Sequence, residues 1–153
     1  SLAQLFSSSG DLKGADVVRV NDDGSKVQRV RKAQDRRVIG VVTDAPGVLL
    51  GGPKRSGTVA VAIQGVVPCR VDAGTQPIVA GDLLVASRVV GHACGIAEGS
   101  APEPGTILGK ALAPLAKGQG VIALSSGEAE FYGLITAIAN ALGITRLSIK
   151  ILE

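Results

Sequence analysis

The chain contains very few aromatic residues. Among its 153 residues there is no Trp, one Tyr and two Phe. Proteins that bind single-stranded nucleic acids stack the bases on aromatic side chains. The sequence therefore lacks the platforms for such a ligand, and its core must be built from Val, Ile, Leu and Ala.

Long apolar runs are also missing. The longest of them is far shorter than the roughly 20 residues that span a bilayer. The first residues, Ser1-Leu2-Ala3-Gln4-Leu5-Phe6, do not have the basic and apolar regions of a signal peptide. We therefore expect a soluble protein with no membrane partner.

Histidine and cysteine are too scarce for a typical metal site. His92 and Cys94 form one close pair, whereas a structural zinc takes four ligands, typically from two close pairs. We predict no metal and no cofactor, with His92 in a turn. Cys69 and Cys94 could form one disulfide, but two free thiols are favoured because nothing indicates an oxidising compartment.

What the chain does have is abundant Gly, Pro and Val. Its 21 Gly and 7 Pro indicate many turns, and Val-rich segments between turns favour strands over helices. We expect strands at 16–20, 38–42, 58–63 and 66–71, with looser alternation over 26–31. Regular structure is expected to start at Asp16, after an N-terminal arm.

Two short motifs occur twice. Gly14-Ala15-Asp16-Val17-Val18 is echoed by Ala80-Gly81-Asp82-Leu83-Leu84, and Val38-Ile39-Gly40-Val41-Val42 by Ile107-Leu108-Gly109-Lys110-Ala111. The near-constant offset suggests two pseudo-repeated β halves. Each Asp is expected to accept backbone N–H groups in the turn that begins a strand, rather than to act in catalysis.

A basic stretch lies between residues 26 and 37 in a chain of net charge +3. One interpretation is an anion-binding or nucleic-acid-binding patch. The other, which we favour, is a solvated strand edge whose charges prevent edge-to-edge pairing. The candidate anion-binding residues are Lys26, Arg29, Arg31, Lys32, Arg36 and Arg37.

The pattern changes after Leu124. Ser125-Ser126-Gly127-Glu128 fits a helix-capping box, and apolar residues then recur at helical spacing up to Gly143. Residues 146–152 alternate like a final strand. A helix so apolar on most sides must be buried on most sides, which predicts a subunit interface. The predicted interface residues are Phe131, Leu134, Ile135, Ile138 and Leu142.

The ordered motifs from Leu2 to about Leu124 resemble a family of β-rich domains near the C-termini of phage tail-fibre and tail-spike proteins. They are Ala3-Gln4-Leu5-Phe6, the two repeated pairs above, Val61-Ala62-Ile63-Gln64-Gly65 and Gly91-His92-Ala93. The resemblance implies a trimeric, structural domain associated with a virion, and some relatives precede a self-cleaving chaperone segment. Gln4 departs from the acidic residue usual in the first motif. The second half is also similar to trimeric phage capsid-decoration proteins.

A second resemblance covers only residues 121–152. Ser125-Ser126-Gly127-Glu128-Ala129-Glu130-Phe131-Tyr132 is similar to a strand-to-helix junction in the RNase H domain of copia-type retrotransposons. That resemblance implies magnesium binding by Glu130. Two-metal hydrolysis needs several carboxylates, and this chain lacks the others. We expect a recombined or chimeric chain in which Glu130 is at most a remnant of a catalytic site.

The sequence therefore predicts a mainly β chain, barrel-like or sandwich-like, with one C-terminal helix and a final strand. Its expected divisions are an arm (1–13), a β-rich domain (14–124) and a helix–strand segment (125–153). The expected function is homo-oligomeric assembly without catalysis, small-molecule substrate or nucleic acid, with a trimer as the expected state. The alternatives are an RNase H-like remnant using Glu130 and an anion-binding module using the basic stretch.

Overall fold

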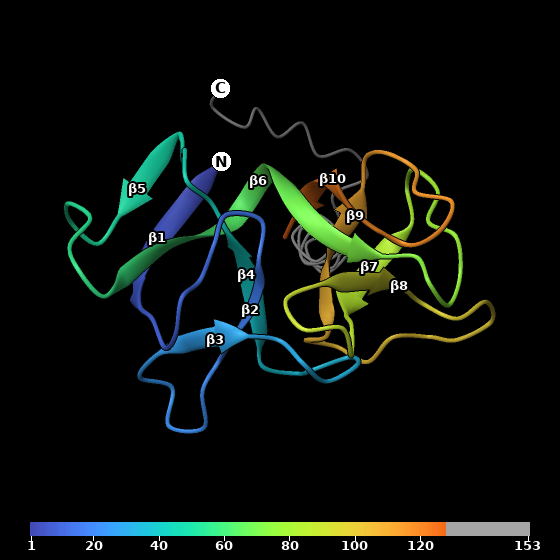
Figure 1. Cartoon of the computed structure of the whole chain (residues 1–153), viewed down its shortest axis with the longest axis horizontal. Helices are drawn as coiled ribbons and strands as arrows, with labels where there is room; N and C mark the ends of the chain where they lie inside the picture. Colours follow the sequence, from blue (N-terminus) through green and yellow to red (C-terminus); the bar gives the residue numbers. More distant parts are fainter. Residues whose placement is uncertain (128–153) are drawn as a thin grey trace, which may run out of the picture.

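Short valine-rich segments separated by turns form an all-β structure. The computed structural model describes residues 1–127, and these contain ten strands (Figure 1). The strands are β1 (Leu2–Ser7), β2 (Val17–Val20), β3 (Val27–Arg29), β4 (Val38–Val42), β5 (Val48–Leu50), β6 (Thr58–Asp72), β7 (Leu83–Ala86), β8 (Ala93–Gly95), β9 (Ile107–Ala111) and β10 (Gln119–Ser126).

The second half of the chain closes into a five-stranded barrel. The C-terminal half of β6 pairs with β10, β10 with β9, β9 with β7, and β7 with β8. A parallel contact between Val71 of β6 and Ala93 of β8 completes the ring. Closure leaves the barrel without a free edge that could pair with another chain.

The first half repeats this order of strands. The N-terminal half of β6 pairs with β1 and β4, β4 pairs with β2, and β2 pairs with β3. A single parallel bridge between Ser8 and Val27 returns from β3 to the end of β1. The short strand β5 lies parallel to β1 on the outside of this ring. Each half is therefore a five-stranded unit, and β6 belongs to both.

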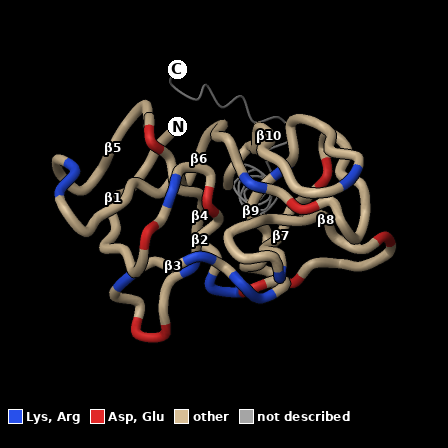
Figure 2. Tube along the Cα trace, viewed as in Figure 1, with Lys and Arg blue, Asp and Glu red and all other residues tan. Residues whose placement is uncertain are grey.

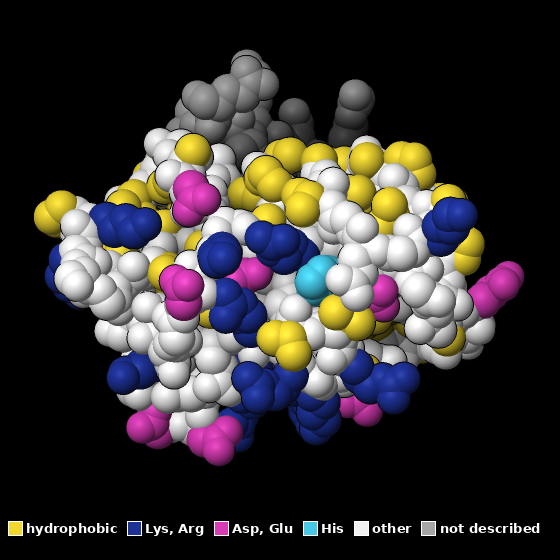
Figure 3. Space-filling model, in the orientation of Figure 1, with side chains coloured by type: hydrophobic (Ala, Val, Ile, Leu, Met, Phe, Trp, Pro, Cys, Tyr) yellow, Lys and Arg dark blue, Asp and Glu magenta, His cyan; other side chains and the backbone are white. Residues whose placement is uncertain are grey.

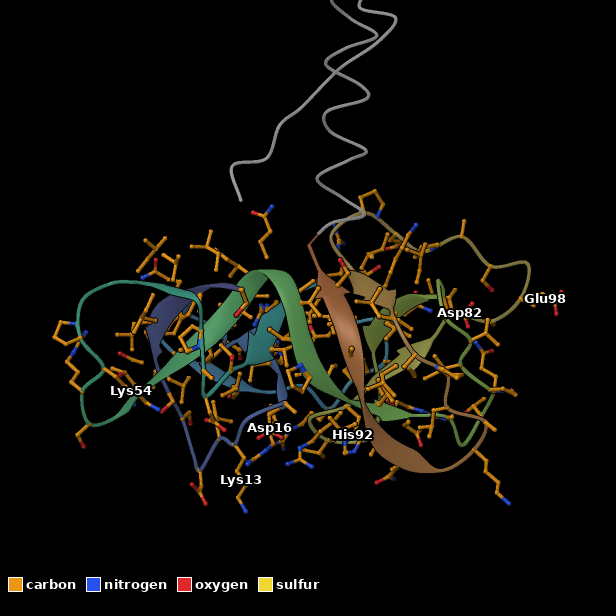
Figure 4. All side chains as sticks on the ribbon, turned by 90° about the horizontal axis from the view of Figure 1, so that it is seen from above. Lys13, Asp16, Lys54, Asp82, His92 and Glu98 are labelled. Atoms are coloured by element: carbon orange, nitrogen blue, oxygen red, sulfur yellow. The ribbon has the colours of Figure 1, made fainter. Side chains whose placement is uncertain are left out.

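The repeated motifs that contain Asp16 and Asp82 form the same turn in the two halves. Asp16 Oδ2 accepts the backbone N–H of Lys13 at 2.8 Å, and Asp82 Oδ2 accepts that of Val79 at 2.9 Å. The preceding residues, Ala15 and Gly81, both have positive φ, 74° and 93°. The expected role of these aspartates in the turns before β2 and β7 is confirmed, and Figure 4 shows the two residues in separate parts of the molecule.

The second repeated motif carries a glycine at a close backbone crossing. A Cβ on Gly40 would lie 2.2 Å from the carbonyl oxygen of Ala62, and one on Gly109 would lie 2.1 Å from that of Ser125. Only glycine allows such an approach. Gly40 of β4 and Gly109 of β9 thus serve the same packing role in the two units.

The core is aliphatic, as the scarcity of aromatic residues requires. The larger cluster fills the second unit and the junction, with Ile78, Leu84, Leu124 and Val71 fully or almost fully buried. A smaller cluster around Val18, Val27 and Val61 fills the first unit. Burial of one such side chain contributes about 1.5–3 kcal/mol relative to exposure.

The fold-class prediction needs correction at the C-terminal end of the β body. Residues 1–127 form a closed barrel and its companion unit and contain no helix. Ser125 and Ser126, expected to cap a helix, instead belong to β10, because their backbones pair with β6 on one side and β9 on the other. The predicted helix and final strand lie outside the described residues.

Regular structure also begins earlier than the sequence indicates. Leu2–Ser7, within the expected arm, forms β1 and pairs with β6 along its whole length. Its alternating burial, with Ala3 and Leu5 inside, explains why it joins the sheet. No helix among residues 1–127 has the length and apolar character needed to cross a membrane.

Candidate assembly surface

One outward face of the barrel is apolar across two paired strands. Along β6, buried Val67, Cys69 and Val71 alternate with exposed Val66 and Pro68. An antiparallel pair normally places polar side chains on the solvent side. Here both sides of this part of β6 are apolar.

The strand β10 extends the same face. Its outward residues Val121 and Ala123 pair with Arg70 and Pro68 of β6. Directly opposed residues of an antiparallel pair share one face of the sheet, with Cβ atoms about 5 Å apart. Ala123 therefore lies beside Pro68, with Val66 and Val121 on either side along their strands.

Leu112 extends this apolar surface to the end of a third strand, β9. It follows β9, and its N–H donates to the carbonyl of Ala123 at 2.8 Å. Leu112, Val66 and Val121 are 47%, 59% and 54% exposed. Figure 3 shows hydrophobic side chains gathered over β6, β9 and β10 along the upper part of the molecule. We call this surface the outer face, defined by Val66, Pro68, Leu112, Val121 and Ala123.

A buried ion cluster fixes one end of the outer face. Asp16 is 3% exposed, and its carboxylate accepts Arg29 Nε at 2.8 Å and Arg70 Nε at 3.1 Å. The backbone N–H of Arg70 also donates to the carbonyl of Ala15 at 3.0 Å. Arg70 of β6 is thus tied to the turn before β2, which holds the second unit against the first.

The cations of the basic stretch have different surroundings. Arg29 is occupied by Asp16 and by the carbonyl of Asp11, and Arg37 forms an ion pair with Asp22. Lys32, Arg36 and Arg37 line a hollow beside Arg19, whereas Lys26 and Arg31 do not. Figure 2 shows basic residues along the segment between β3 and β4. The structure therefore brings together half of the predicted anion-binding set.

The cysteines and the histidine occupy ordinary structural positions. Both cysteines are free thiols, as expected. Burial raises the pKa of Cys69 far above its usual range, and burial also raises the pKa of Cys94. His92 Nδ1 lies 2.8 Å from the carbonyl oxygen of Val90, in the turn between β7 and β8 (Figure 4). Among residues 1–127, no group of three or more His, Cys, Asp or Glu side chains is placed to hold a metal.

The remaining predicted site residues fall after residue 127. Glu130, the candidate carboxylate, and the interface set Phe131, Leu134, Ile135, Ile138 and Leu142 lie outside the described residues. Their predicted roles stay predictions.

Two features of this region were not identified from the sequence. The first is the outer face, although Val66-Val67-Pro68-Cys69-Arg70-Val71 has apolar residues at both parities, a sign that a strand is covered on both sides. The second is the pairing of Asp16 with Arg29 and Arg70. No local pattern indicates that pairing, because residues 16 and 70 meet only through the arrangement of the two units.

Comparison with known proteins supports the fold. No protein-family model and no curated protein matches the chain. Among solved structures, the C-terminal fragment of bacteriophage phi29 gene product 12 is similar with a TM-score of 0.59 and 15% identity, over 82% of this chain and 99% of that fragment. The head fiber gp8.5 N base of bacteriophage phi29 gives a TM-score of 0.44 and 12% identity, over 81% and 92%. The comparisons do not show the RNase H resemblance, and the β body of this chain shares its fold with a phage protein.

Proposed function

We propose that this chain is a structural assembly domain that associates with copies of itself through the outer face, as a homotrimer of the phage-fibre type and without catalysis. The observation that carries the proposal is the continuous apolar surface across β6, β10 and the end of β9. The partner we infer is a second copy of the chain. A surface that binds copies of its own chain is covered when the oligomer forms, so it can stay apolar without a separate binding protein.

The energetics favour burial of this surface. Val66, Leu112 and Val121 are each about half exposed, and full burial of such a side chain is worth about 1.5–3 kcal/mol. A stable interface removes on the order of 800 Å² per partner from water. The outer face supplies the apolar centre of such a patch, and Arg70 lies at its rim on β6.

The fold adds independent support. The fragment of phi29 gene product 12, which is a phage protein, has a similar β fold. The barrel that carries the outer face is a closed ring of strands. Association through this face therefore works through side chains rather than through strand addition.

The outer face is tested by charge substitution. Val66→Asp and Val121→Asp place a charge on side chains that already reach solvent, so each isolated chain should still fold. In an interface, an unpaired charge costs several kcal/mol. We expect both variants to lose the oligomer, measured by light scattering coupled to size exclusion, and to keep the β-sheet circular dichroism of the parent.

The matched control is Val90→Asp. Val90 is 49% exposed and lies in the turn between β7 and β8, so it belongs to neither of the strands β6 and β10. It should leave the oligomer intact. A parent-like mass for Val66→Asp and Val121→Asp would refute the role of the outer face.

A further inference from the structure

A second polar feature of the molecule lies in the loop between β3 and β4. This loop and β2 line a hollow of about 680 Å³, whose charged lining comes from Arg19, Lys32, Asp35, Arg36, Arg37 and Glu103. Glu103 belongs to the segment before β9, so the hollow sits where the two units meet. It lies outside the outer face and plays no part in the proposed assembly.

The loop that supplies the cations is held in place from both sides. Asp35 is 5% exposed, lies 2.6 Å from Arg19 Nε and accepts the backbone N–H of Arg37 at 2.9 Å. The N–H of Gln34 donates to the carbonyl of Ala86 on β7 at 2.9 Å. The basic side chains therefore project from an anchored backbone, which reduces the entropy lost when a ligand binds.

The charges of the hollow do not cancel. Asp35 is used by Arg19, and Arg37 pairs with Asp22 at its outer side. Within residues 1–127, Lys32 and Arg36 form no ion pair, and Glu103 is the carboxylate that remains on the lining. Arg19 and Arg37 are thus each paired with a carboxylate. Lys32 and Arg36 remain opposite the single carboxylate of Glu103, an excess of one positive charge. The hollow is therefore electropositive and has donors to spare.

We propose that this hollow binds a ligand carrying two or more phosphate groups. Guanidinium groups bind phosphate oxygens through paired N–H donors, and a lysine adds a mobile positive charge. Several cations on one anchored loop fit a chain of phosphates better than a single one. Because the described residues of the lining include no aromatic side chain, recognition rests on phosphate charge and not on base stacking.

The phosphates can come from an inorganic polyphosphate or from a nucleic-acid backbone, and binding assays separate these sources. Fluorescence anisotropy with a labelled 12-nucleotide single strand tests the backbone, and calorimetry with tripolyphosphate tests the inorganic chain. Both are run on the full chain at about 50 mM salt and again at about 200 mM. We expect the affinity to fall steeply with salt, because counterions are released from the phosphates.

Two double variants, each of which removes two positive charges, test whether the hollow itself binds the ligand. Lys32→Gln with Arg36→Gln removes two cations of the hollow, and Lys26→Gln with Arg31→Gln removes two exposed cations outside it. We expect about a tenfold or greater loss of affinity for the first pair and less than about a twofold loss for the second. Equal losses would show attraction by net charge alone and overturn the proposal. Failure of both ligands to bind at low salt would overturn it as well.

Discussion

Arg70 donates its Nε to Asp16 Oδ1 at 3.1 Å and thereby joins β6 to the turn before β2. The same carboxylate holds Arg29 on its other oxygen. The structurally equivalent Asp82 accepts the backbone of Val79 but forms no ion pair with a described residue. The two turns share the same backbone hydrogen bond to the aspartate, but only Asp16 also forms ion pairs with described residues. Comparing substitutions of the two aspartates therefore measures what the ion pairs contribute to stability.

Asp16→Asn should destabilise the fold more than Asp82→Asn. Asparagine keeps an oxygen that can accept the turn N–H, but it leaves Arg29 and Arg70 without their counter-charge. Loss of one partner in a fully buried pair costs about 3–5 kcal/mol. Because both arginines are partly exposed, we expect about 2 kcal/mol for Asp16→Asn and under about 1 kcal/mol for Asp82→Asn. Urea unfolding measures both, and equal losses would contradict the role of the ion cluster.

Gly40→Ala and Gly109→Ala should both be severely destabilising. Each new Cβ would meet a backbone carbonyl oxygen near 2 Å, and the strands would have to separate. We expect a loss of about 3 kcal/mol or more in the free energy of unfolding, or failure to fold. Gly24→Ala is the control, because Gly24 has positive φ but open space around it, and it should cost only about 1 kcal/mol. A similar small loss at all three positions would refute the close crossings.

The two thiols should differ in reactivity. Cys69 is fully buried and the pKa of its thiol is strongly raised, while Cys94 is only partly buried. A raised pKa lowers the thiolate fraction at a given pH, and the thiolate is the reactive form. With a disulfide reagent at pH 8, Cys94 should react slowly and Cys69 much more slowly. In denaturant both should react at the same fast rate. Fast modification of Cys69 in the folded protein would contradict its burial.

The sequence predicted the local features of the β body well. The turns at Asp16 and Asp82 and the strands at residues 17–20 and 38–42 follow from short patterns of turn residues and Val. These features are local, because a few neighbouring residues decide the backbone conformation. The repeated motifs likewise mark positions that form the same hydrogen bonds in the two units.

The sequence did not predict how the units are joined. Residues 58–63 and 66–71 were expected as separate strands, but they form one strand, β6. Its first half pairs with β1 and β4, and its second half pairs with β10, so partners are present along its length. In the same way, β10 continues through Ser125 and Ser126 because two neighbouring strands offer partners. Long-range pairing decides both cases, and local propensity does not contain it.

The most direct test of the assembly account is the mass of the full chain in solution. Sedimentation velocity at tens of micromolar protein should give a single species with three times the 15.4 kDa mass of one chain. Val66→Asp should shift that species towards one chain while Val90→Asp should not. A parent protein that sediments as a 15.4 kDa monomer at this concentration would contradict the account.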